Sequence, residues 1–371
     1  MLKIAVISDI HLGHNKNRAS KIIENLRLAI NDNPESTELD ILFLAGDVFD
    51  QLLDLNSPDL NDIDFWICDT LRYCAKHDIV LRILEGTPSH DWMQSDRFMT
   101  IASILNLPKL DIQYITNVHI EYMERFDIHI LYVPDEIQPT TEKTLSLVKS
   151  SMMAKGLDKV DYAIMHGQFE YQLPQHIKNI PRHNSHDYLS IVKQLIFIGH
   201  IHTHSISDRI VAQGSFDRLK HNEEEPKGYV KAFIENNERQ IFFIENKNAR
   251  TYKTLNCAGK ELEESLKYIK KKVLPLRENS CVRINAESKH PIFSNMDELV
   301  RMYPSIVWSK RISDEKENDT LPSEEQNEIM EYNPTTISKE NLLDLMRPRL
   351  ELNFTDANTL LICENLIKEF L

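Results

Sequence analysis

The chain has 371 residues, of which 42% are hydrophobic and 27% charged, with only 9 glycines and 15 prolines. This composition excludes a disordered, collagen-like or low-complexity protein and predicts a globular one, with a length that allows roughly two or three domains. The formal net charge of -14 argues against unspecific coating of DNA, but it is compatible with a nuclease whose carboxylates hold metal ions.

The cysteines and the apolar segments indicate the cellular compartment. The five cysteines are scattered and form no CxxC pair, so we expect neither a disulfide framework nor a thiolate zinc site. The first apolar run is too short for a signal peptide, and no segment approaches the roughly 20 apolar residues of a membrane span. We therefore expect a soluble, unexported, cytoplasmic protein that has no contact with a membrane.

Six short apolar runs predict buried β-strands, and amphipathic patterns between them predict helices. The expected strands cover residues 3–8, 41–46, 79–86, 128–134, 162–167 and 194–202, and the clearest helical patterns cover 22–30 and 65–76. Three further runs, at 209–215, 228–234 and 239–245, are expected to form successive antiparallel strands. This alternation predicts an α/β fold class with a mixed β core.

The second half of the chain changes in composition, which predicts four segments in all. Residues 1–249 would form the main domain, and 250–311 a small α/β domain with three strands and two helices. Many acidic and few apolar residues predict a flexible linker at 312–334. Residues 335–371 hold two amphipathic patterns interrupted at Pro348, and this helix pair would bury its apolar stripes against a partner or against the main domain.

Carboxylates and imidazoles stand at the ends of the predicted strands. Asp9 and His11 follow the first strand, Asp47 the second, His90 and Asp91 the third, and His166, His200 and His202 the fifth and sixth. Because the carboxyl ends of strands share one edge in an open α/β sheet, these side chains should meet there. One Asp-x-His pair alone would be a capped turn with a solvated histidine. The ordered set instead predicts a metal site, whose ligands favour Mn²⁺, Fe or Zn²⁺ over Ca²⁺.

These motifs resemble the series found in calcineurin-like metallophosphoesterases. More narrowly, SDIHLG at 8–13, AGDVFD at 45–50, GSF at 214–216 and PKGY at 226–229 are similar to the SbcD-type DNA double-strand-break repair nucleases, including phage versions. The resemblance in motifs spans residues 9–229. It implies a metallophosphoesterase β-sandwich flanked by helices, with a capping domain after the core.

The resemblance also implies the roles of individual residues at two divalent ions, for which Mn²⁺ is the expected metal. The first ion would be held by Asp9, His11, Asp47 and His202, and the second by Asp47, His166 and His200. Ser89 stands where the family has an asparagine ligand, so Ser89 or water fills that position, or the second ion binds weakly. His90 would contact the phosphate or protonate the leaving oxygen, and Asp50, which matches bacterial members, is counted with it as catalytic.

The implied activity is DNA exonuclease and endonuclease cleavage in repair, recombination or replication, by attack of a metal-bound hydroxide on phosphorus. The family works with an SbcC-type coiled-coil ATPase, and the resemblance implies a complex in which this chain is a homodimer. Because the sequence has no GxxxxGK[ST] loop, any use of ATP would come from the ATPase partner. Two alternatives stay open. One is a small-molecule or protein phosphoesterase on the same fold, and the other is a non-catalytic scaffold with a degenerate site.

Overall fold

The computed structural model of the chain describes residues 1–54, 56–135, 138, 140–173, 180–236 and 238–313. The chain divides into two units, 1–316 and 317–371. The predicted helix pair at 335–371, and the predicted acidic linker beyond residue 313, lie outside the described residues. Within the described residues, none of the helices combines the length and the apolar character that crossing a membrane requires.

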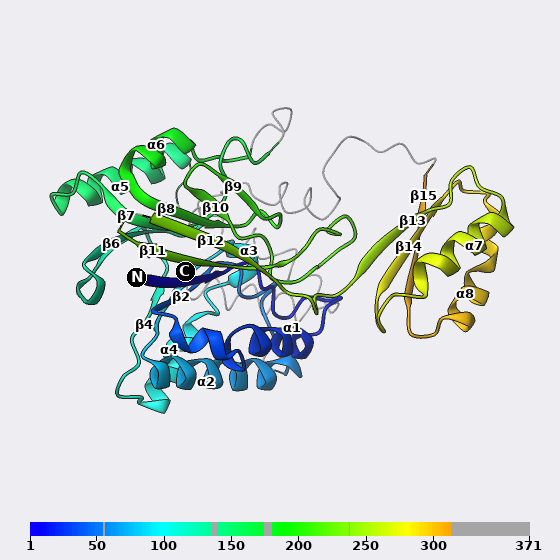
Figure 1. The fold of residues 1–371 in the computed structure, drawn as a ribbon, viewed down its shortest axis with the longest axis horizontal. Coiled ribbons are helices and arrows are strands. Elements are labelled where there is room, and N and C mark those ends of the chain that lie inside the picture. The colour runs from blue at the N-terminus through cyan, green and yellow to red at the C-terminus, as the bar shows by residue number, and fades with distance from the viewer. Residues whose placement is uncertain (55, 136–137, 139, 174–179, 237, 314–371) are drawn as a thin grey trace, which may run out of the picture. The chain divides into compact units, whose positions relative to one another are not determined.

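Two six-stranded sheets form the centre of the main domain (Figure 1). The first sheet has the order β12 (Glu238–Glu245), β11 (Gly228–Glu235), β1 (Leu2–Ile7), β2 (Ile41–Ala45), β3 (Val80–Leu84) and β4 (Ile112–Ile115). The second has the order β5 (His119–Met123), β6 (Ile128–Val133), β7 (Val160–His166), β8 (Val192–Gly199), β10 (Ile210–Ala212) and β9 (Ser205–Ser207). Strands β1 to β4 are mutually parallel, as are β6, β7, β8 and β10.

The two sheets pack face to face because their strands carry apolar side chains on both faces. Val6 and Phe43 of the first sheet share one buried cluster with Ile164 and Phe197 of the second. The intervening residues, such as Leu44, point outward into a second cluster. Side chains of a strand alternate between its faces, so strands that are apolar throughout can be covered on both faces only between two layers.

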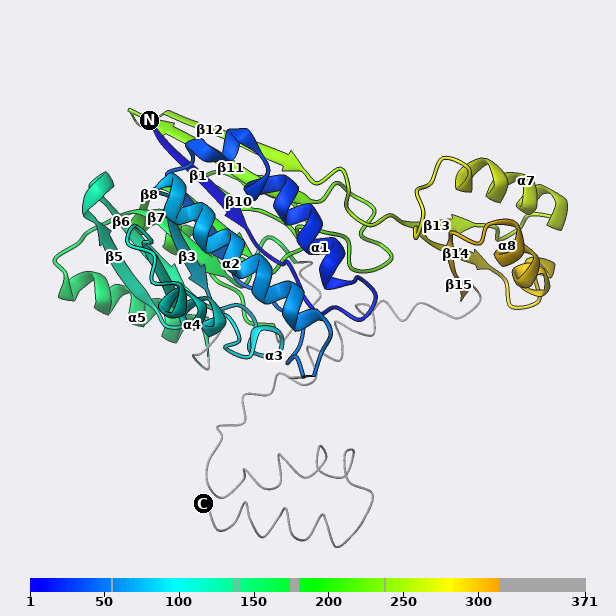
Figure 2. The same cartoon turned by 90° about the horizontal axis from the view of Figure 1, so that it is seen from below.

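Helices cover the outer face of each sheet and complete four layers (Figures 1 and 2). On the first sheet lie α1 (Ala19–Leu26), continued by a π-helical turn (Arg27–Asn31), α2 (Asp59–His77) and α4 (Asp96–Leu105). On the second sheet lie α5 (Thr141–Ala154) and α6 (Ser185–Ile191). Short helical turns connect elements elsewhere, among them α3 (Pro88–Asp91) and the 3-10 turns Pro34–Glu38, Glu124–Phe126 and Pro291–Asn295. The α/β fold class predicted from the sequence is confirmed.

A separate small sheet follows the main domain. It is parallel, with the order β13 (Tyr252–Asn256), β14 (Cys281–Ala286) and β15 (Val307–Ile312). Helices α7 (Leu262–Val273) and α8 (Met296–Met302) share one apolar cluster with it. The predicted elements of 250–311 therefore match in type and order, and the domain boundary at 249/250 stays a prediction.

The pairing expected after residue 209 is partly wrong. Strands β11 and β12 are antiparallel, as predicted, and β11 continues antiparallel onto β1. Strand β10, however, joins the second sheet, where it lies parallel to β8 and antiparallel to β9. Its three apolar residues are fully buried between those two neighbours, a position that the local pattern of the sequence does not reveal.

Candidate metal centre

The polar strand ends of both sheets meet at one place. Asp9 and Asp47 each follow by two residues the end of a first-sheet strand, β1 or β2, while His166 ends β7 and His200 follows β8 in the second sheet. Three groups of side chains each place one ligand atom per residue within 4.8 Å of the others: Asp9, His11 and His202; Asp47, His166 and His200; His11, Asp50 and His90. All the metal-ligating histidines and aspartates expected from the sequence lie in these groups.

The backbone that carries these side chains is strained. The φ angle is positive at four of these residues, 52° at Asp9, 55° at His11, 50° at Asp47 and 96° at His200. Residues other than glycine rarely adopt positive φ angles. Hydrogen bonds hold the conformation, because the N–H of Asp9 donates to Gly46 O at 3.1 Å and that of His11 to Asp47 O at 3.1 Å. Strain of this kind persists only where the surroundings fix it, and it clusters at functional sites.

Two glycines allow the strand ends to approach this closely. A Cβ atom on Gly46 would lie 2.2 Å from His166 Nδ1, and one on Gly86 would lie 2.1 Å from the backbone nitrogen of Asp47. Neither position has room for a side chain. Gly46 and Gly86 are thus explained by close packing against His166 and Asp47, two of the three residues of the second group.

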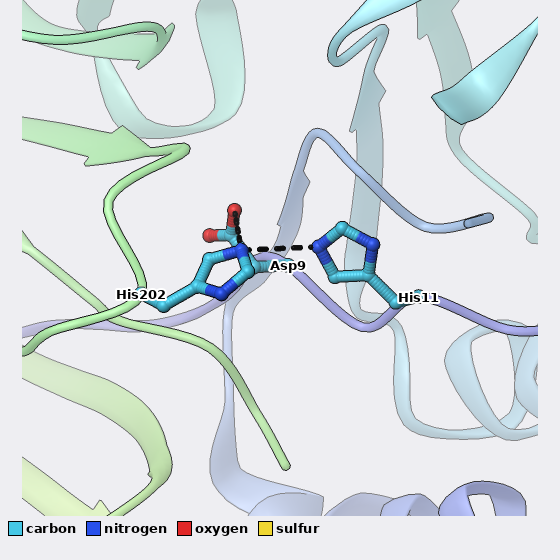
Figure 3. Close-up of side chains that lie close together, drawn as sticks. All are labelled: Asp9, His11 and His202. Carbon is cyan, nitrogen blue, oxygen red and sulfur yellow. Dashed lines mark hydrogen bonds and ion pairs between the residues drawn. The ribbon is translucent and has the colours of Figure 1, made fainter. Parts of the chain in front are cut away.

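The first group consists of Asp9, His11 and His202, whose side chains point toward one another (Figure 3). The Nε2 atoms of His11 and His202 are 3.2 Å apart, and His202 Nε2 lies 3.8 Å from Asp9 Oδ1. Two ring nitrogens that face each other beside a fully buried carboxylate need a shared proton or a cation between them. This donor set of oxygen and imidazole nitrogen fits Mn²⁺, Fe or Zn²⁺.

The rings are oriented by hydrogen bonds at their other nitrogens. His11 Nδ1 donates to Asp50 Oδ1 at 3.0 Å, His202 Nδ1 to Glu223 Oε1 at 2.9 Å, and His166 Nδ1 to the carbonyl of Ala45 at 2.8 Å. When these rings are neutral, Nε2 is therefore the atom that carries the lone pair toward the groups. Such outer partners set the tautomer and direction of metal-ligating histidines.

Asp47 belongs to the second group and also reaches the first. Its Oδ1 lies 3.2 Å from His166 Nε2, and its Oδ2 lies 3.9 Å from His11 Nε2. Burial alone would raise the pKa of Asp47, but the charges of His166, His90 and His11 outweigh this and hold it well below its usual value. The Asp47 carboxylate therefore lies between two sets of imidazole nitrogens.

Thr87, rather than Ser89, brings a hydroxyl to the second group. Thr87 Oγ1 donates to Asp47 Oδ2 at 3.2 Å and lies 3.3 Å from His200 Nδ1 and 3.5 Å from His166 Nε2. Ser89 is exposed, and its backbone carbonyl accepts a hydrogen bond from Trp92 Nε1. Thr87 directly follows Gly86, whereas Ser89 lies two residues further along the chain. Thr87, and not the predicted Ser89, is therefore the candidate oxygen ligand.

Asp91 locks the loops that carry the site. Its buried carboxyl group accepts from the backbone N–H of Asp47 at 3.0 Å, of Phe49 at 2.8 Å and of Gly86 at 2.8 Å. Burial, reinforced by the charges of Asp47 and Glu85, raises the pKa of Asp91 well above its usual value. This residue holds the ends of β2 and β3 together beneath the second group.

His90 and Asp50 lie beside the first group. His90 Nδ1 donates to the carbonyl of Asp50 at 2.8 Å, and the His90 ring centroid is 5.0 Å from that of His11. His90 is half-buried. Burial alone would raise the pKa of Asp50, but the hydrogen bond with His11 and the charge of His11 outweigh burial, so the pKa lies below its usual value. Asp50 therefore acts on the orientation of His11, while its predicted catalytic role stays a prediction.

Sequence reasoning missed two residues of the site, Thr87 and Glu223. Thr87 follows a glycine at a strand end, as Asp47 follows Gly46, and this parallel was the available signal. Glu223 belongs to three consecutive glutamates before the PKGY motif. Its partner His202 is 21 residues earlier, and no local pattern links the two.

Comparisons with known proteins are limited to distant structural similarity. No family model matches the chain, and no curated protein matches it. One solved crystal structure matches with a TM-score of 0.39 and 12% identity, over 66% of this chain and 99% of its own. The crystal structure of TT1561 from Thermus thermophilus matches with a TM-score of 0.35 and 12% identity, over 65% of this chain and 98% of its own. Similarities this low carry no argument about family or function.

Proposed function

We propose that this chain is a two-metal DNA nuclease of the SbcD type, built on a metallophosphoesterase sandwich. The observation that supports this most is the position of Asp47, with one oxygen toward His166 and the other toward His11. A carboxylate between two nitrogen-rich groups suits a pair of ions roughly 3.5–4 Å apart, the arrangement that phosphoryl hydrolysis uses. The sequence motifs described above support the nuclease class within that chemistry.

The proposed ligand sets follow from the groups. Asp9, His11, Asp47 and His202 would hold one ion, and Asp47, Thr87, His166 and His200 the other. When bound, the two ions would lower the pKa of water toward neutrality and neutralise the charge that develops on the phosphate. Mn²⁺ is the metal that we propose, since the family resemblance implies it and the donors, oxygen and imidazole nitrogen, are compatible with it.

The protein itself would supply a proton donor. Water adds to phosphorus, the bond to the leaving oxygen breaks, and that oxygen must gain a proton. Because Nδ1 of His90 donates to the Asp50 carbonyl, proton exchange by this ring falls to Nε2. His90 is half-buried beside the first group, which is suitable for contact with a phosphate or with the leaving oxygen.

Cleavage assays on defined substrates test the proposed function. Purified full-length chain is incubated with linear duplex DNA, single-stranded DNA, a chromogenic phosphodiester and a chromogenic phosphomonoester, with Mn²⁺ or with a chelator. We expect Mn²⁺-dependent DNA cleavage. Hydrolysis of the phosphomonoester without DNA cleavage would favour a small-molecule phosphoesterase, and hydrolysis of none of them would favour a non-catalytic scaffold.

We further propose that the chain works as a homodimer with an SbcC-type coiled-coil ATPase, docked through residues 335–371. The sequence resemblance and the two amphipathic patterns in that segment support this proposal. A chain ending at Tyr332 should keep its Mn²⁺-dependent activity but no longer co-purify with the ATPase. Co-purification of the shortened chain at the full-length yield would contradict the proposed docking segment.

A further inference from the structure

His202 lies in a loop and needs outside support to point at the first group. His166 is held on strand β7, whereas His202 lies between β8 and β9, outside any strand. Its ring nitrogen Nδ1 donates to Glu223 Oε1 at 2.9 Å, across a chain separation of 21 residues. This bond leaves Nε2 facing His11 and Asp9, as Figure 3 shows.

Glu223 is itself fixed in a buried, charge-balanced position. It is only 6% exposed. Its Oε2 accepts from the backbone N–H of Leu219 at 3.0 Å and lies 3.6 Å from the ammonium group of Lys227. Burial alone would raise the pKa of Glu223, but His202 and Lys227 lower it, so the carboxylate is ionised. A hydrogen bond to a charged acceptor is stronger than one to a neutral acceptor, so a carboxylate in a fixed position can restrict the orientation of the ring.

The same buried lysine holds the backbone of His202. Lys227 donates to the His202 carbonyl at 2.8 Å and to Glu225 Oε1 at 2.7 Å, and its side chain is fully buried. Glu223 thus restrains the ring and Lys227 the main chain of one loop residue. Because Lys227 keeps Glu225 as a partner, losing the charge at Glu223 does not leave the ammonium group without a carboxylate.

We propose that Glu223 is a positioning residue of the first group, holding the His202 ring so that Nε2 faces Asp9 and His11. The inference rests on the proposed function only in treating that group as a metal site. Outer carboxylates of this kind typically change metal affinity by about 10–100-fold when they are removed. Glu223 would therefore act on metal binding without contacting the substrate.

The neighbouring glutamate provides a matched control. Glu224 accepts from the backbone N–H of Thr254 at 2.8 Å and forms an ion pair with Lys253, both on β13. Glu224 belongs to the same loop as Glu223, between β10 and β11, but its partners lie on β13 and do not include His202. A general effect of loosening the loop would therefore appear in a Glu224 variant, whereas an effect of ring orientation would appear only in a Glu223 variant.

Calorimetric titration of the metal-free, full-length chain with Mn²⁺ tests the proposal. We expect Glu223→Ala to weaken one of the two Mn²⁺ binding events by about 10–100-fold. Glu223→Gln should restore part of that loss, because its amide oxygen can still accept from Nδ1. Glu224→Ala should stay within twofold of the wild type. An unchanged affinity in Glu223→Ala, or an equal loss in Glu224→Ala, would overturn the proposal.

Two further comparisons keep the result interpretable. If Glu223→Ala does not fold by circular dichroism, Glu223→Asp replaces it, since its shorter side chain should no longer reach Nδ1 and should weaken the same event. The test is also separable from the nuclease proposal. Wild-type chain that binds Mn²⁺ but does not cleave DNA would refute the nuclease function alone, while wild-type cleavage with unaltered binding in the Glu223 variants would refute the positioning role alone.

Discussion

Oδ1 of Asp47 lies 3.2 Å from Nε2 of His166, and the two residues come from different sheets. Asp47 follows β2 in the first sheet, and His166 ends β7 in the second. The second group therefore exists only when the two sheets are packed against each other. The apolar cluster between the sheets thus sets the geometry of the candidate metal centre as well as the stability of the fold.

Replacing Asp47 should disconnect the two groups. We expect Asp47→Ala to lower DNA cleavage by orders of magnitude, because a bridging carboxylate positions both ions. The variant Asp69→Asn, which alters only a surface ion pair with Arg27, serves as the control. Cleavage rates are measured under saturating Mn²⁺, with circular dichroism to establish folding. A folded Asp47→Ala protein that cleaves DNA at the wild-type rate would disprove the assignment.

Thr87 and Ser89 can be separated by single substitutions. We expect Thr87→Ala to raise the Mn²⁺ concentration for half-maximal activity by about tenfold, as loss of a weak ligand or outer partner does. Thr87→Ser keeps the hydroxyl and should restore much of the affinity. Ser89→Ala should leave the Mn²⁺ requirement unchanged. The opposite order, with Ser89→Ala impaired and Thr87→Ala normal, would return the ligand role to Ser89.

His90 should affect turnover rather than metal binding. We expect His90→Ala to lower kcat by about 10²–10⁴-fold, the usual contribution of a positioned acid or base. Calorimetry should give the same two Mn²⁺ affinities as for the wild type, because the proposed ligands are intact. Should His90→Ala instead lose one Mn²⁺ binding event, His90 would be a ligand and its role as a proton donor would be wrong.

His183 makes the stability of the protein depend on pH. Its ring is buried between Phe169 and Tyr188, and burial lowers its pKa to about 4. The unfolded chain, with an ordinary pKa near 6.5, binds the proton more readily. Its contribution is therefore fully present above about pH 6.5 and is lost as the pH falls toward 4.

The difference between these pKa values corresponds to about 3 kcal/mol, of which about 2 kcal/mol should disappear between pH 7 and pH 5. Urea unfolding of the metal-free chain at the two pH values measures the loss. In His183→Gln the loss should be smaller by that amount, whereas His186→Gln, which changes an exposed ring, should behave as the wild type. Equal pH dependence in all three proteins would contradict this prediction.

The strands of the core could be predicted because their sequences are unambiguous. Strands β1, β2 and β3 are largely apolar runs, interrupted only at Lys3 and Arg82, that end in polar motifs. The structure places them within two residues of the expected limits. Strands β4 and β5 were not predicted. They lie at sheet edges and contain polar residues that are half-buried or exposed, so their pattern resembles that of a loop.

The part of the candidate site that lies at strand ends could be predicted from the sequence. Asp9 and Asp47 lie where parallel strands of the first sheet end, so the fold class brings these two together, whereas His166 ends a strand of the second sheet and meets them only because the two sheets are packed. The remaining contacts depend on loops. The sequence predicted Ser89 as the oxygen ligand, whereas in the structure the backbone N–H and the hydroxyl group of Thr87 donate to the carboxylate of Asp47. The bond between Glu223 and His202 joins two loops and requires the tertiary structure.

The most direct test of the account is to locate the metal ions in the protein. Crystals of the full-length chain are soaked in Mn²⁺, and anomalous scattering is recorded from the wild type and from Asp47→Ala. The account predicts two anomalous peaks in the wild type, roughly 3.5–4 Å apart, one among Asp9, His11 and His202 and the other among His166, His200 and Thr87, with Asp47 between them. A wild-type crystal with one peak or none under saturating Mn²⁺ would contradict the two-metal centre.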